Sequence, residues 1–175
     1  MSSEVFLPIL QFICLGIITF VMFKKPNYYS GVLLVIGVLM GLLTGYYQGG
    51  YVDNLLVQIT FWFIGVGEII GFTGHVFMAK KVAHSIGWEP SPFQFELGLA
   101  SLGMGIAGIL TMWFQNGFIA AVVIISAVFL LGAAYVHAKE MIVKKNFSPN
   151  NAGVIFYTDI LGPVILLILL GIKYI

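Results

Sequence analysis

Charge is what this sequence has least of. Only 9% of its 175 residues are charged, whereas soluble domains average about 25%. Arginine is absent, so all eight basic residues are lysines, and the formal net charge is +1. Neutralising nucleic-acid phosphates needs a dense basic patch, and the chain has none. The composition therefore argues against a nucleic-acid partner.

The sequence also has only one cysteine, and its start does not look like a removable signal peptide. The single cysteine, Cys14, lies in an apolar run and cannot form an intrachain disulfide. Residues 1–4 lack the positive start and the small-residue cleavage pattern of a signal peptide. We therefore expect the first apolar stretch to be retained as a spanning helix.

Apolar residues are abundant: they make up 60% of the chain, and the mean hydropathy is +1.04. They fall into segments of about 20 residues, the length with which a helix crosses a bilayer. Open strands cannot satisfy their backbone in lipid. We predict an all-α integral membrane bundle, a single domain over residues 1–175. Six helices are expected at about 5–23, 30–47, 54–78, 92–113, 118–138 and 152–172.

The lysines indicate the topology of these six helices. Seven of the eight fall on one side, and only Lys173 falls on the other. The positive-inside rule then puts the connections after the first, third and fifth helices in the cytoplasm, and both termini outside. The seven are Lys24, Lys25, Lys80, Lys81, Lys139, Lys144 and Lys145.

Two helix starts have recognisable signals. Asp53 is a good N-cap for the third helix. Ser91, Pro92 and Gln94 supply an N-cap, a first-turn proline and the third position of a capping box for the fourth.

Glycines recur at every fourth residue in the second and third helices. Such ladders are typical of close packing between membrane helices. Packing within the chain is the simpler interpretation, and a face for a homo-oligomer or a membrane-complex partner is the alternative. The glycines are Gly37, Gly41 and Gly45 in one helix and Gly67 and Gly71 in the other.

Ionisable residues inside the spans are the candidates for function, because each is costly in hydrocarbon and usually faces the bundle interior. Glu68 and His75, seven residues apart, share one helix face. Glu96, His137 and Asp159 lie on three other helices, and with His75 they fall in the cytoplasmic third of the predicted bilayer. These five residues are predicted to form one polar site.

Plainer roles exist for most of these residues. His75 could bond a neighbouring helix, and His137 with Glu140 could lie at headgroup level. Glu68 is harder to explain in this way, because a carboxylate near mid-membrane must be protonated, paired or solvated.

Three function classes can use such a set. One is an accessory subunit whose polar interior holds helices together, and another is a small ion or proton pathway. The third is a metal- or haem-dependent membrane enzyme using His75 and His137, with Glu68 and Glu96 as further metal ligands. We favour the first two, because the histidine spacing matches no metal motif. Whether the chain is an enzyme stays open.

The most distinctive string is GWEPSPFQFELG, residues 87–98. It resembles a motif in a prokaryotic, largely archaeal, family of small multi-pass membrane proteins of unknown function. The resemblance implies a multi-pass fold in a prokaryotic cell membrane and marks Glu96 as part of the motif. It implies no activity.

Overall fold

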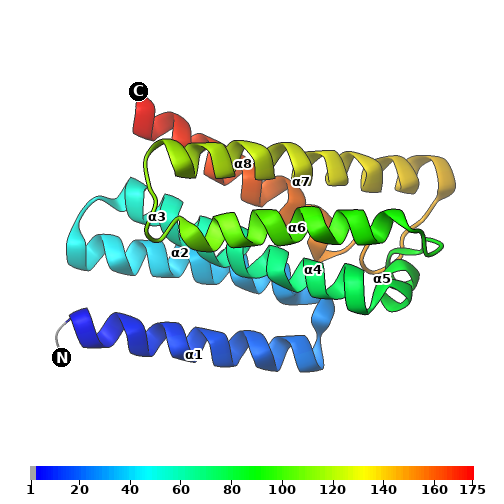
Figure 1. Cartoon of the computed structure of the whole chain (residues 1–175), viewed down its shortest axis with the longest axis horizontal. Helices are drawn as coiled ribbons and strands as arrows, with labels where there is room; N and C mark the ends of the chain where they lie inside the picture. Colours follow the sequence, from blue (N-terminus) through cyan, green and yellow to red (C-terminus); the bar gives the residue numbers. More distant parts are fainter. Residues whose placement is uncertain (1–2) are drawn as a thin grey trace.

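The structure, a computed structural model, describes residues 3–175 and places its long helices side by side along the molecule (Figure 1). No strand occurs within these residues. The elements are α1 (Ser3–Lys24), η1 (Pro26–Tyr28), α2 (Tyr29–Gln48), α3 (Tyr51–Ile59), η2 (Thr60–Val66), α4 (Gly67–Phe77), α5 (Ala79–Ile86), α6 (Phe93–Leu110), α7 (Gly117–Lys144) and α8 (Val154–Tyr174).

Five helical segments are long and apolar enough to cross a membrane. They are Pro26–Gln48, Tyr51–Phe77, Phe93–Leu110, Gly117–Lys144 and Val154–Tyr174. Helix α1 contributes a shorter apolar stretch, Phe6–Met22. Large apolar side chains cover the outside of the bundle, as Phe12 and Val128 show, which are 74% and 72% exposed. Such a surface suits lipid and not water. The chain is therefore a helical membrane protein.

The two ends of the bundle differ in charge. The C-terminal ends of α1 and α7, together with α5, meet at one end, on the right in Figure 1. These elements and the residues directly after α1 and α7 carry the seven lysines named above, so we call it the lysine end. Both termini and the Gly49–Gly50 turn lie at the other, which we call the terminal end.

The predicted third helix is built from three pieces. Helices α3 and α4 are joined by η2, a π-helical segment, into one run from residue 51 to residue 77. Asp53 is not the N-cap: Gly49 and Gly50, with φ of 78° and 67°, turn the chain so that α3 begins at Tyr51. Asp53 lies in the first turn and pairs instead with Lys173, 2.6 Å away.

Two helical stretches lie beyond the predicted spans. Helix α5 covers a stretch expected to be a connection, and it buries Ala83 and Ile86 while its lysines are exposed. Helix α7 continues to Lys144. Two bonds expected of the predicted capping box are present, since Phe93 N donates to Ser91 Oγ (3.3 Å) and Ser91 N donates to Gln94 Oε1 (3.4 Å). The N-cap is Pro92, however, and not Ser91, because α6 begins at Phe93.

Helices α2 and α3 pack as an antiparallel pair with backbones in close approach. A Cβ added to Gly37 would lie 2.8 Å from Ile59 Cα, and one added to Gly41 would lie 2.8 Å from Leu55 Cα. At Gly45 it would meet Tyr51. A larger side chain at these three positions would push the two helices apart. Gly67 and Gly71 have ordinary van der Waals surroundings.

Candidate functional site: an acidic cavity near the lysine end

A cavity of about 530 Å³ lies inside the half of the bundle toward the lysine end. Every helix except α3 contributes to its wall. Most of the wall is aliphatic or aromatic, and a few polar side chains face the space. This volume falls in the range of small-ligand sites, about 300–1,000 Å³. Four of the five residues predicted from the sequence line it: Glu68, His75, His137 and Asp159.

Glu68 and Asp159 are the acidic groups of the cavity. Glu68 comes from α4 and is 9% exposed, and Asp159 comes from α8 and is 7% exposed. The two carboxylates line the same cavity, together with Tyr29 of α2. Within residues 3–175 neither carboxylate forms an ion pair. The structure thus buries two carboxylates in one cavity without a bonded cation.

Small polar groups surround the two acids. Ser101 of α6 faces Glu68 across Gly71: a Cβ on Gly71 would lie 3.6 Å from both Ser101 Oγ and Glu68 Oε2. Next to Asp159, the Thr158 hydroxyl donates to Ser30 Oγ over 2.9 Å. This bond ties α8 to α2 beside the cavity. Ser30 and Ser101 therefore add hydroxyl groups to the wall that holds the two acids.

His75 lies seven residues, or about two helical turns, after Glu68 on α4 and lines the same cavity. Its Nδ1 atom is buried and has no hydrogen-bond partner among the described residues. The neighbouring α6 passes close by, since a Cβ on Gly98 would lie 3.4 Å from His75 Cβ. The imidazole is thus available to a molecule in the cavity.

His137 is held by its surroundings. Its ring stacks on Trp88, with centroids 5.6 Å apart and planes 15° apart. Asn151, which is 0% exposed, donates through Nδ2 to the carbonyl of Asn146 (2.8 Å), so its Oδ1 faces His137 Nδ1 at 2.8 Å. This arrangement places a proton on Nδ1 of His137.

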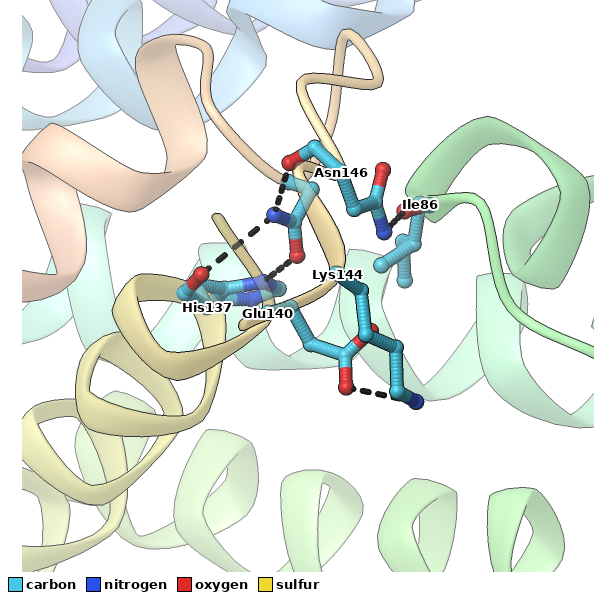
Figure 2. Close-up of polar contacts among 6 residues, drawn as sticks. Ile86, His137, Glu140, Lys144 and Asn146 are labelled. Atoms are coloured by element: carbon cyan, nitrogen blue, oxygen red, sulfur yellow. Dashed lines mark hydrogen bonds and ion pairs between the residues drawn. The ribbon is translucent and has the colours of Figure 1, made fainter. Parts of the chain in front are cut away.

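Three asparagines of the α7–α8 connection lie at the lysine end, where Asn150 lines the cavity, and we call them the asparagine clasp: Asn146, Asn150 and Asn151. Asn146 donates to the carbonyl of Ile86 (2.8 Å), and Asn150 donates to Ser85 Oγ (2.9 Å). Figure 2 shows Asn146, Ile86 and His137 together, with the Lys144–Glu140 ion pair (2.9 Å) beside them. The clasp joins α5, α7 and the connection to α8.

Glu96 lies apart from the other predicted residues. It is exposed on α6 and is not part of the cavity wall. The inward face of α6 carries Gly98, Ser101, Gly105 and Gly108, which are all buried. Two residues of helix correspond to about 200°, so Glu96 points away from the face that Gly98 presents.

A metal site has little support from the positions of the side chains. Within residues 3–175, no three His, Cys, Asp or Glu side chains gather closely enough to hold a metal ion. The four ligands considered from the sequence, His75, His137, Glu68 and Glu96, include one outside the cavity.

Several residues of the cavity were missed at the level of sequence. Tyr29, Ser101 and the asparagine clasp carry no charge inside a predicted span, so a search for ionisable residues passes over them. The only signal was the polar run of residues 146–151, which the sequence identifies simply as a linker.

The fold and the cavity together define a class: a multi-pass helical membrane protein with an acidic cavity inside the bundle. The chain belongs to DUF6790, a family of unknown function, whose profile matches residues 27–175. The matched region holds α2 to α8 and all five candidate residues. No curated protein and no solved structure matches the chain.

Proposed function

We propose that the protein conducts or exchanges a proton or a small cation across a prokaryotic cell membrane, through the site formed by Glu68 and Asp159. In this proposal α1 is the sixth spanning helix, the lysine end faces the cytoplasm and both termini face outward. The observation that carries the proposal is the pair of buried carboxylates from α4 and α8 in one cavity.

The chemistry follows from the surroundings of this pair. Two neighbouring carboxylates in a low-dielectric site cannot both stay charged without a proton or a cation to neutralise them. The cavity wall includes one lysine, Lys81. It is exposed and forms no ion pair with either acid among the described residues. A mobile positive charge is therefore the natural partner. His75, with a free ring nitrogen in the same cavity, would pass a proton toward the lysine end.

The test is ion flux into liposomes that contain the purified protein. Proton, sodium and potassium gradients are applied in turn, and internal pH or cation concentration is followed by fluorescence. Glu68→Gln and Asp159→Asn keep the shape of each side chain and remove its charge. Each should lower the flux by about 100-fold or more, the usual cost of removing an acid–base group.

Glu96→Gln is the matched control, because it removes a carboxylate that is exposed and outside the cavity. It should leave the flux within about twofold of wild type, as expected for a surface position. Wild-type protein that carries none of the three ions faster than empty liposomes would overturn the proposal. A purely accessory role would then be the better account of the polar interior.

A further inference from the structure

A second opening, of about 660 Å³, lies at the terminal end of the bundle, and we call it the vestibule. It is bordered by α1, α2, α3 and the α6–α7 connection. Its rim is exposed and its floor, formed by Thr44 and Gln58, is buried. Side-chain carboxamides dominate its polar lining: Gln11, Gln48, Asn54, Gln58 and Gln115.

Gln58 at the floor is the informative residue. It is 4% exposed, and its Oε1 atom has no hydrogen-bond partner among the residues that the structure describes. Its neighbour at the floor, Thr44, is satisfied, since its hydroxyl bonds the carbonyls of Met40 and Gly41. Buried polar atoms are nearly always paired. Gln58 therefore contributes a polar side chain with an unpaired oxygen to the wall of an opening, where an exchangeable partner can enter from outside.

The vestibule and the acidic cavity share no wall residue, but the α3–η2–α4 run borders both: it carries Gln58 in the vestibule wall and Glu68 in the cavity wall. Between these two residues in the sequence, Thr60 Oγ1 and Trp62 Nε1 are also buried and lack partners within the described residues. The run that borders both spaces therefore carries further unpaired polar atoms.

We infer that the vestibule is the outer mouth of the pathway and that it takes up a small inorganic cation, part of whose water shell is replaced by carboxamide oxygens. This inference rests on the proposed function and names the ion. Oxygen ligands suit hard cations. Carboxamides do not titrate near neutral pH, so a path for protons alone would gain little from five of them.

Charge at the rim agrees with a cation. Asp53 is the only ionisable residue in the vestibule wall. Its bond to Lys173 (2.6 Å) keeps that lysine at the rim, and the carboxylate partly neutralises the charge of the lysine. Beyond Trp62, the next charged groups along the run are the cavity carboxylates. A cation thus moves from neutral oxygens to anionic ones as it enters.

The first test measures whether water reaches the floor. In a Cys14→Ser background, Gln58→Cys is treated with a small cationic thiol reagent in folded protein in liposomes. We expect labelling, although the side chain is almost fully buried. Ile59→Cys is the matched control, since Ile59 is adjacent, 0% exposed and outside the vestibule wall, and it should stay unlabelled. Equal protection of both cysteines would overturn the inference.

The second test measures flux. Gln58→Leu keeps the size but removes the oxygen, and it should lower sodium or potassium flux by about tenfold or more, the cost of losing one polar partner of a charged group. Gln58→Asn should restore part of it. If the wild type carries an ion and Gln58→Leu carries it equally fast, the role of the vestibule is overturned and the proposed function stands. No wild-type flux of any ion overturns the proposed function, and with it the assignment of this mouth.

Discussion

The two ends of the bundle differ in how their amide side chains are held. At the lysine end, Asn146 and Asn151 bond backbone carbonyls and His137, and Asn150 bonds Ser85 Oγ while its Oδ1 lacks a partner among the described residues. At the terminal end, Gln58 lines an opening, and its buried Oε1 atom has no partner within the described residues. The first arrangement fixes the shape of the fold, and the second leaves room for an exchangeable partner. Stability should therefore depend on the lysine end, and ion uptake on the terminal end.

The largest loss of stability is expected from a substitution of Asn151 at the lysine end. Asn151→Ala removes partners from the His137 ring and the Asn146 carbonyl inside a fully buried site. The expected loss of unfolding free energy is about 2–4 kcal/mol, because buried groups lose their partners. The measurement is an SDS titration of the protein in detergent, followed by circular dichroism.

Asn54→Ala is the corresponding change at the terminal end. Asn54 also donates to two backbone carbonyls, those of Gly49 and Gly50, but it is partly exposed. Water can replace those bonds, so the loss should be only about 0.5–1 kcal/mol. Equal losses for the two variants would contradict the difference between the ends.

A pair of glycines tests the same difference between the two ends. Gly87 and Gly50 both have the left-handed αL conformation, with φ of 80° and 67°, at opposite ends. A Cβ on Gly87 would collide with Ser148 Oγ and lie 2.7 Å from Asn146 Oδ1, whereas the nearest atoms to a Cβ on Gly50 lie 3.9 Å away.

Alanine at these two positions should therefore cost different amounts. Gly87→Ala combines backbone strain with disruption of the clasp, and we expect it to cost about 2–3 kcal/mol. Gly50→Ala bears the strain alone, about 1 kcal/mol. The same SDS titration measures both, and a larger loss for Gly50→Ala would show that crowding at Gly87 is unimportant.

The smallest effect is expected from the ion pair at the vestibule rim. Asp53→Asn and Lys173→Met, alone and combined, should give a coupling free energy of about 0.2–1 kcal/mol, as for other exposed pairs. It should fall as salt is raised from 0.05 to 0.5 M, roughly the range over which screening becomes strong. A coupling that does not change with salt would mean that the pair is shielded from solvent.

The sequence predicted a helical membrane bundle because hydropathy alone determines which segments can lie in lipid. It also selected Glu68 and His75 as a pair, since a separation of seven residues returns to the same helix face, and both line the cavity. The inward face of α6 was harder to predict. Its sequence is apolar and glycine-rich on all sides, so nothing distinguished the face of Gly98 from that of Glu96.

Other features depend on tertiary contacts that no local pattern encodes. Asn151 occupies a linker, and its burial appears only when α5 and α7 meet. Gln58 is uncharged, so a search for ionisable groups does not select it. The π-helical segment contains no proline from which a change in the helix could be predicted.

That segment, η2, sets the rotation of one half of the long helix relative to the other. A π-helical turn holds about one residue more than an α-helical turn, which changes the direction of every later side chain by roughly 100°. Helix α3 can therefore keep Leu55 and Ile59 against the glycines of α2, while α4 independently turns Glu68 into the cavity. One continuous span thus has two separately adjustable faces, one matched to a neighbouring helix and one to the cavity.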